Sequence, residues 1–183
     1  AVGAGIWPAG TPNVYPLTKS LRFRSSASAY LNRTPASASN RRLWTWSGWV
    51  KRGLLTGGQT LFGTANGATD TTLMSVGFYD GTFMVSTGTR VLKESANQLR
   101  DPSAWYHVVF AVDTTQATST NRVKIYVNGS QITAFGTASY PTQNLNPFFN
   151  SAVGHNVGAN IYSGAREQYF DGYMTDIYFI DGQ

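Results

Sequence analysis

The chain has 183 residues and a net charge of +5, and 42% of its residues are hydrophobic while only 13% are charged. This length fits one globular domain with an arm, since domains average roughly 150 residues, and the composition excludes charge-driven disorder. The chain contains no cysteine, which excludes disulfides, thiolate metal sites and cysteine nucleophiles, and no apolar run approaches the ~18 residues of a membrane-spanning helix.

The first 16 residues predict an extended arm rather than a packed element. The segment contains Trp7-Pro8, Gly10, Pro12 and Pro16, and proline fixes φ and removes a backbone donor. Because such an arm usually needs a partner, Trp7 is a candidate docking residue.

The remainder, residues 17–183, predicts strands. Aromatic residues make up 14% of the chain, Val and Thr are abundant, and no stretch shows a sustained helical recurrence of apolar residues. Ten strand candidates lie between turn signals, and their spacing indicates an all-β sandwich. They are 17–24, 28–33, 43–52, 59–65, 72–79, 82–87, 90–94, 104–113, 122–128 and 168–181.

Two strands and two turns have the clearest signals. Residues 43–52 (LWTWSGWVKR) and 105–113 (WYHVVFAVD) carry apolar side chains on both faces, so we expect central strands that are covered at least in part on each side. Asn128-Gly129 predicts a hairpin with a type I′ turn, because both residues accept positive φ. Asp80-Gly81, after Tyr79, predicts a similar turn.

Residues 133–167 predict a long loop with room for one short strand. Loops of this length are usually functional or disordered. We expect an ordered loop, because its aromatic side chains and those that follow need burial: Phe148, Phe149, Tyr162, Tyr169 and Phe170.

Positive charge is concentrated early in the chain. Residues 1–69 contain eight basic and no acidic residues, whereas residues 70–183 contain six basic and nine acidic ones. If the first third packs as neighbouring strands, one sector would attract anionic partners. The equally weighted alternative is that the arginines pair with acids from the later chain. The basic residues are isolated rather than clustered and no nucleic-acid motif is present, so specific nucleic-acid binding is not expected.

Four segments in order resemble the laminin-G-like, concanavalin-A-like jelly roll. They are LWTWSGWVKR, WYHVVFAVDTT, NRVKIYVNG and FDGYMTDIYFIDG. The resemblance covers about residues 17–183 and implies an antiparallel two-sheet jelly-roll sandwich.

A narrower resemblance is to the variants of this fold in bacteriophage virion proteins. The segments SLRFRSSASAYLNRTP and MTDIYFIDGQ are similar to theirs. The resemblance implies a place on a virion, with other virion proteins and copies of the chain itself as partners. A homo-oligomer is expected, and a trimer would suit a fibre.

The acidic residues do not predict catalysis. The fold also houses glucanases, but retaining hydrolysis needs two carboxylates roughly 5 Å apart. Glu94 and Glu167 lack a second carboxylate at the family's spacing, and Asp171 and Asp176 fall on opposite strand faces unless a bulge intervenes. We therefore expect no enzyme activity.

No cofactor is predicted, and calcium is possible in this fold without being indicated here. Oxygen ligands could come from five residues that form no run: Asp70, Asp80, Asp113, Asn121 and Asn128. Of the two imidazoles, His107 is expected to be buried and bonded to backbone or a polar neighbour, whereas His155, in the Gly/Asn-rich loop, could contact a ligand.

Sugar sites in such folds combine aromatic platforms with amide and arginine donors in loops. The candidate ligand-binding residues are Tyr79, Tyr140, Phe148, Phe149, His155, Asn156, Asn160, Tyr162 and Arg166. The alternative for each aromatic residue is that it fills the core beneath the loops. The candidate docking residues are Trp7, Arg22, Arg24, Arg41 and Arg42.

These observations favour a non-catalytic recognition module on a phage fibre, spike or head appendage that binds an anionic or neutral host-surface glycan. The alternative is a capsid or tail decoration protein that docks through its arm and basic strands without binding sugar.

Overall fold

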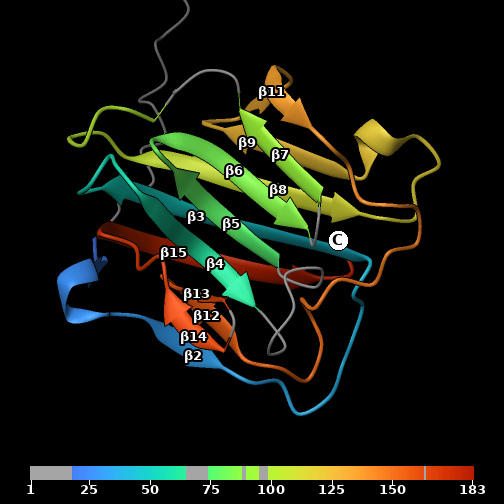
Figure 1. The fold of residues 1–183 in the computed structure, drawn as a ribbon, viewed down its shortest axis with the longest axis horizontal. Coiled ribbons are helices and arrows are strands. Elements are labelled where there is room, and N and C mark those ends of the chain that lie inside the picture. The colour runs from blue at the N-terminus through green and yellow to red at the C-terminus, as the bar shows by residue number, and fades with distance from the viewer. Residues whose placement is uncertain (1–17, 65–73, 88–89, 95–98, 163) are drawn as a thin grey trace, which may run out of the picture.

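The computed structural model describes residues 18–64, 74–87, 90–94, 99–162 and 164–183. Two sheets lie face to face, and every pairing between the described strands is antiparallel. The expected all-β jelly-roll sandwich is confirmed (Figure 1).

The six-stranded sheet forms the rear layer in Figure 1. Its strand order is β1 (Leu21–Phe23), β15 (Gly172–Asp181), β3 (Leu43–Arg52), β8 (Tyr106–Asp113), β9 (Val123–Val127) and β10 (Ser130–Ile132). Segments from both ends of the chain are therefore neighbours, because β15 pairs with both β1 and β3.

The seven-stranded sheet forms the front layer, and a separate hairpin lies beside it. The strand order is β11 (Phe135–Ala138), β7 (Arg90–Glu94), β6 (Thr82–Thr87), β5 (Met74–Tyr79), β4 (Gly58–Thr64), β12 (His155–Val157) and β2 (Leu31–Arg33). The hairpin consists of β13 (Asn160–Tyr162) and β14 (Ala165–Glu167). Two short 3-10 turns, η1 (Ser25–Ala27) and η3 (Ser119–Asn121), complete the described elements.

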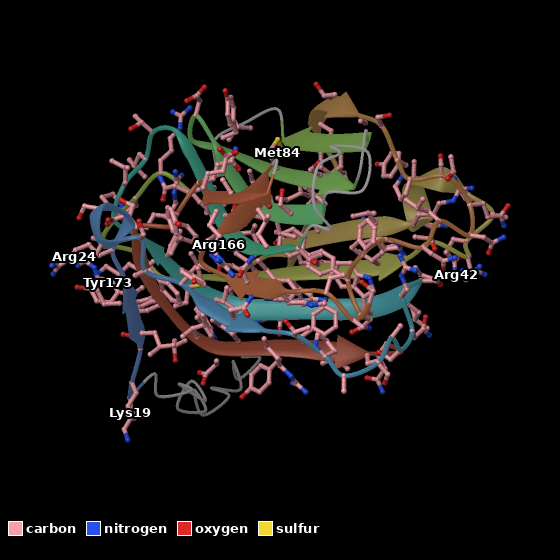
Figure 2. All side chains as sticks on the ribbon, turned by 60° about the horizontal axis from the view of Figure 1, so that its bottom comes forward. Lys19, Arg24, Arg42, Met84, Arg166 and Tyr173 are labelled. Carbon is pink, nitrogen blue, oxygen red and sulfur yellow. The ribbon has the colours of Figure 1, made fainter. Side chains whose placement is uncertain are left out.

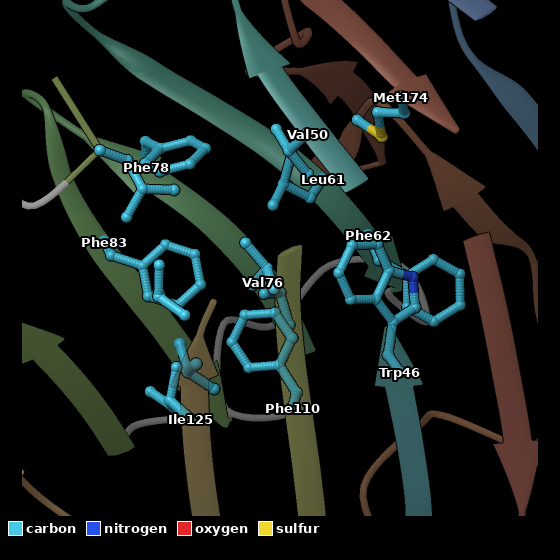
Figure 3. Packing of buried hydrophobic residues seen from close by; sticks show 14 of the residues in the cluster. Trp46, Val50, Leu61, Phe62, Val76, Phe78, Phe83, Phe110, Ile125 and Met174 are labelled. Atoms are coloured by element: carbon cyan, nitrogen blue, oxygen red, sulfur yellow. The ribbon is translucent and has the colours of Figure 1, made fainter. Parts of the chain in front are cut away.

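The core is built from alternating residues whose side chains face the other sheet. Along β3 the residues alternate between fully buried and half-buried, so one face enters the core and the other is partly covered. Trp46 packs against Phe62 of the opposite sheet with ring centroids 6.5 Å apart, and against Phe110 at 5.6 Å (Figure 3). Central strands were expected at 43–52 and 105–113, and both occupy interior positions.

Both predicted turns are confirmed by their backbone angles. Asn128 and Gly129 have φ values of 49° and 80°, and Asp80 and Gly81 have 48° and 78°. Each pair joins two adjacent antiparallel strands without further residues, as a type I′ turn requires.

The prediction for residues 133–167 was wrong in one respect: the segment contains four short strands, β11 to β14, rather than at most one. Strand β12 inserts between β4 and β2 and pairs with both. Its partners come from distant parts of the chain, and three residues are too few to show alternation. No local feature of the sequence therefore predicted a strand at β12.

His107 also differs from expectation. It is half-buried on the outer face of the six-stranded sheet, where its ring lies 5.2 Å from that of Trp49. Because its neighbours Val108 and Phe110 take the inward positions of β8, His107 falls on the face that turns away from the core.

Candidate functional site

Three amide side chains meet on the outer face of the seven-stranded sheet, where β2, β12 and the β13–β14 hairpin come together. Asn156 lies opposite Asn32 on one side and Gly63 on the other. The Oδ1 atom of Asn156 accepts a hydrogen bond of 2.9 Å from Asn32 Nδ2 and a longer one of 3.5 Å from Arg166 Nε. The third amide belongs to Asn160, the first residue of β13.

Glycines in β4 allow the hairpin and the residues after it to lie directly on the sheet. A Cβ atom at Gly63 would lie 3.0 Å from Asn160 Oδ1, and a Cβ atom at Gly58 would lie 2.9 Å from Gln168 Cγ. Larger residues at these two positions would push the hairpin away from the sheet.

Two polar atoms in this cluster are buried without a partner. Asn156 and Asn160 are 0% and 2% exposed. Within the described part of the chain, neither Asn156 Nδ2 nor Asn160 Oδ1 has a hydrogen-bond partner. A buried polar group left unpaired costs about 1–3 kcal/mol, so such atoms usually have a role or an unseen partner. The pair offers one donor and one acceptor.

An aromatic and cationic layer lies over the amides. The Arg166 guanidinium stacks on the ring of Tyr30 at 4.6 Å, and Tyr169 lies 6.3 Å from the same ring. Tyr30 is 37% exposed and Arg166 is exposed. Among the described residues Arg166 makes no ion pair, and the residue is exposed.

On strands β5 and β6, the outer face beside this cluster carries small or uncharged side chains. Because Val76, Phe78, Phe83 and Val85 point into the core, the alternate residues of β5 and β6 point outward. These are Ser75, Gly77, Tyr79, Thr82, Met84 and Ser86. Figure 2 shows Met84 on this face together with Arg166.

The structure brings together three of the nine predicted ligand-binding residues: Asn156, Asn160 and Arg166. Tyr79 shares the outer face, 46% exposed, but sits at the far end of β5, at the turn to β6. The side chain of Tyr162 lies outside the described part. Tyr30, Asn32 and Tyr169 were missed, because nothing local in residues 28–33 links them to residues 156–169.

The aromatic residues predicted for the loop lie elsewhere. Phe149 is 0% exposed and stacks on Phe62 with centroids 4.8 Å apart, so its ring is unavailable to a ligand and that prediction is corrected. Tyr140 packs against the edge of the core. Phe148 is half-buried beneath the Arg41 guanidinium, 5.5 Å from its ring centroid. These three fill space under the loop, which was the stated alternative.

His155 also faces inward and is buried, so the accessible position that contact with a ligand would need is corrected. Its Nε2 atom accepts the Asn150 backbone N–H at 3.1 Å, and its Nδ1 lies 2.7 Å from the Val153 carbonyl oxygen. The ring is therefore neutral with its proton on Nδ1. Burial lowers the pKa of His155, and the nearby charge of Arg33 lowers it further. The hydrogen bond to the Val153 carbonyl oxygen raises it, but by less.

This burial predicts a loss of stability at mildly acidic pH. Because the folded-state pKa of His155 lies below its unfolded value of about 6.5, the unfolded chain binds the proton first, and stability falls as the pH drops below that value. Burial also lowers the pKa of His107, the other histidine. Both histidines therefore contribute to the loss of stability of the wild type at low pH. Urea denaturation of wild type and His155→Gln measures this loss. Between pH 7.5 and 5, the free energy of unfolding is expected to fall less in the variant than in wild type. An equal fall would contradict the assignment.

The early basic residues do not form one positive sector. Lys19 and Arg24 lie at one end of the molecule and Arg42 at the other (Figure 2). Arg22 pairs with Asp171 at 3.6 Å and donates to Tyr173 Oη at 2.7 Å. The single-sector expectation is corrected, because β1, β2 and β3 occupy different places in two sheets.

Two of the predicted docking residues bind the chain's own loop. Arg41 donates to the carbonyl oxygens of Asn146 and Pro147 at 2.8 and 2.6 Å, and Arg42 donates to Asn146 Oδ1 at 2.9 Å. Arg24 is exposed, and Trp7 lies outside the described residues.

Two of the oxygen ligands considered for calcium are engaged in hydrogen bonds within the chain. Asp113 accepts from Thr115 and Gln116, and Asn128 Oδ1 accepts the His107 N–H; Asp70 lies outside the described ranges. Within those ranges no group of three or more His, Asp or Glu side chains gathers. No described helix is long and apolar enough to cross a membrane.

Comparison with known proteins identifies relatives of this architecture. The family model of the concanavalin A-like lectin/glucanases superfamily matches residues 25–182 of this chain. A search of curated proteins found no match. Among solved structures, the heptameric SAP-like pentraxin from Limulus polyphemus aligns with a TM-score of 0.54 and 20% identity, over 82% of this chain and 68% of that one.

Two further structures of this fold contain sugars. Domain 4 of AbnA, an extracellular arabinanase from Geobacillus stearothermophilus, is in complex with arabinotriose; it aligns with a TM-score of 0.53 and 20% identity, over 79% of this chain and 62% of that one. The CBM40 domain of the Ruminococcus gnavus IT-sialidase is bound to α2,3 sialyllactose. It aligns with a TM-score of 0.54 and 15% identity, over 81% of this chain and 91% of that one. At these identities the likeness concerns the fold.

Proposed function

Because this chain belongs to the concanavalin A-like lectin/glucanases superfamily, we propose that it is a non-catalytic carbohydrate-binding domain. Its site is the outer face of the seven-stranded sheet beside the β13–β14 hairpin. The observation that carries this proposal is the pair of buried, unpartnered amide atoms, Asn156 Nδ2 and Asn160 Oδ1.

The chemistry of a sugar hydroxyl matches this pair. A hydroxyl group both donates and accepts, so hydroxyls of a bound sugar can satisfy the free amide N–H and the free amide oxygen together once the Arg166 and Tyr30 side chains that cover the amides move aside. Arg166 adds charged donors for further hydroxyls or for an acidic group on the glycan, and charge-assisted bonds are the stronger kind. That two domains of the same fold hold arabinotriose and sialyllactose supports this class of ligand.

We further propose that the domain stands on a phage particle, repeated in several copies, and that its ligand is a glycan of the host surface. The support is the resemblance of SLRFRSSASAYLNRTP and MTDIYFIDGQ to phage virion proteins. The alternative is a decoration protein that docks through its arm and basic strands. Its basic strands have less support, since Arg41 and Arg42 are engaged within the chain, and its arm lies outside the described residues. Adsorption of the purified domain to host cells, competed by their isolated surface polysaccharide, tests the placement.

Arg166→Ala is expected to weaken glycan binding at least tenfold, because a lost charge-assisted bond is worth about 1.5–3 kcal/mol. The variant is expected to lose no more than about 1 kcal/mol of stability, since the side chain is exposed and loses one cation–π contact with Tyr30. Binding is measured on a glycan array and then by calorimetry with the best hit.

Arg24→Ala is the matched control, because Arg24 is also an exposed arginine but lies near the end of the molecule that carries Lys19 and Tyr173 (Figure 2). It is expected to bind as wild type does. Equal affinity of wild type and Arg166→Ala, or no glycan bound by wild type at all, would overturn the proposed site. Release of shorter oligosaccharides during long incubation would overturn the non-catalytic assignment.

A further inference from the structure

The outer face of the six-stranded sheet carries three rows of side chains that are mostly apolar. Because Trp44, Trp46 and Val50 point into the core, the alternate residues of β3 point outward. Residues paired across antiparallel strands share a face, so the pairings of β3 with its neighbours define the rows. They are Thr175, Trp49 and His107; Tyr178, Ser47, Val109 and Tyr126; and Ile180, Thr45, Ala111 and Lys124. We call this set the apolar rows.

The apolar rows are accessible, and none of the described strands lies over them. Tyr178 is 54% and Ile180 is 41% exposed, whereas Trp49 and Val109 are half-buried. Lys124, at the β9 end, is the one lysine, arginine or carboxylate among them. Each described strand belongs to one of the two sheets or to the β13–β14 hairpin, which lies on β4 of the other sheet. An exposed apolar patch of this kind usually marks a contact surface.

The apolar rows correspond to the apolar residues on both faces of 43–52 and 105–113, from which we expected a cover on each side. The seven-stranded sheet covers the inner side, where Phe62 packs against Trp46. A cover on the outer side would come from residues that the structure does not describe or from another molecule.

Residues 1–17, which lie outside the described part, have the composition of such a cover. They contain no charged side chain, and burial of an unpaired charge on an apolar surface would be costly. Their large apolar side chains are Val2, Ile6, Trp7, Val14, Tyr15 and Leu17.

The first described residues lie beside the apolar rows. The Lys19 carbonyl oxygen accepts a hydrogen bond of 2.6 Å from Thr175 Oγ1, and Thr175 belongs to the first row. Trp7 precedes Thr18 by eleven positions, over which an extended chain spans up to about 36 Å. Three strand spacings, from β15 to β9, amount to about 14 Å. Trp7 can therefore reach each of the three rows.

We propose that residues 1–17 bind the apolar rows of their own chain, with the Trp7 indole, the largest apolar group of the segment, against Val109 and its neighbours. The same face of a second copy is equally apolar. However, a short covalent link gives the chain's own face an effective concentration in the millimolar range, which another copy in micromolar solution does not match. The contact lies on the sheet opposite the carbohydrate site, so either proposal can fail without the other.

A spin label in the full chain tests this contact by NMR. Because the chain contains no cysteine, Ala9→Cys places one nitroxide label two residues after Trp7. The methyl signals of Val109 and Ala111 are expected to lose at least twofold more intensity than that of Met84, on the outer face of the other sheet, relative to the sample with the label reduced. Equal losses at the three methyl groups would overturn the proposal.

A mixed sample distinguishes the chain's own arm from that of another copy. It contains spin-labelled protein without isotopes and isotope-labelled protein without the spin label. The Val109 and Ala111 signals are expected to keep their intensity in this sample. Loss of intensity there as great as in the singly labelled protein would show that the arm binds a second copy, contrary to the proposal.

Two lysine substitutions serve as a matched pair in the spin-labelled chain. Val109→Lys places a charge among the apolar rows and is expected to restore the Ala111 signal at least twofold. Met84→Lys makes the same change on the outer face of the other sheet and is expected to leave the Ala111 signal weakened. Trp7→Ala leaves the sheet untouched and is expected to restore the signal as Val109→Lys does. An Ala111 signal that stays weak in Trp7→Ala, or that responds equally to both lysines, would refute the contact.

Discussion

Replacing Phe149 with alanine is expected to lower the free energy of unfolding by about 3–5 kcal/mol, the usual cost of removing a buried phenylalanine. The ring is fully buried and contacts aromatic residues of both sheets. It stacks on Phe62 at 4.8 Å and meets Trp44 edge-on at 4.8 Å. The deletion would leave a cavity between the sheets that rigid strands cannot close. Urea denaturation followed by tryptophan fluorescence measures the loss.

Phe148→Ala is the matched control, because it removes the same side chain one residue earlier. Phe148 is half-buried and contacts the Arg41 guanidinium. Its removal is expected to cost less than about 2 kcal/mol. Equal losses for the two variants would contradict the placement of Phe149 in the core.

These two neighbours show where sequence reasoning stops. Residues 133–167 carry no sustained alternation, so nothing in Pro147-Phe148-Phe149 indicates which ring points inward. In contrast, 43–52 is a ten-residue segment with apolar side chains on both faces, and its predicted bounds and central position are those of β3. Asn128-Gly129 was equally clear, because a type I′ turn depends on two adjacent residues alone.

The candidate site depends on long-range pairing, which a single sequence does not reveal. Asn156, Asn160 and Arg166 were predicted because amide and arginine side chains gather in one glycine-rich segment. Asn32 completes the cluster by its 2.9 Å bond to Asn156, across 124 positions of the chain. Tyr30 and Tyr169 are likewise far apart in the sequence, although their ring centroids lie 6.3 Å from each other. Only the insertion of β12 between β4 and β2 brings these residues together.

Arg52 is a charged residue that the alternating pattern of β3 places in the core. It is 1% exposed, and its guanidinium lies 4.0 Å from the centroid of the Phe78 ring. Its Nη1 donates to the Leu99 carbonyl oxygen at 3.0 Å and to that of Gly81 at 3.4 Å, while Nε and Nη2 have no partner among the residues that the structure describes. Burial lowers the pKa of Arg52 to about 10. The side chain therefore stays charged at neutral pH, where the full cost of its desolvation remains.

Two substitutions separate the charge of Arg52 from its volume. Arg52→Met keeps most of the side-chain volume and removes the desolvation cost along with the two hydrogen bonds, so it is expected to change the free energy of unfolding by less than about 2 kcal/mol. Arg52→Ala also opens a cavity against Phe78 and is expected to cost about 3–5 kcal/mol. Chemical denaturation at neutral pH compares the two. If methionine destabilises the domain as much as alanine, the guanidinium holds Leu99 and Gly81 in place through its charge, and the volume of the side chain is secondary.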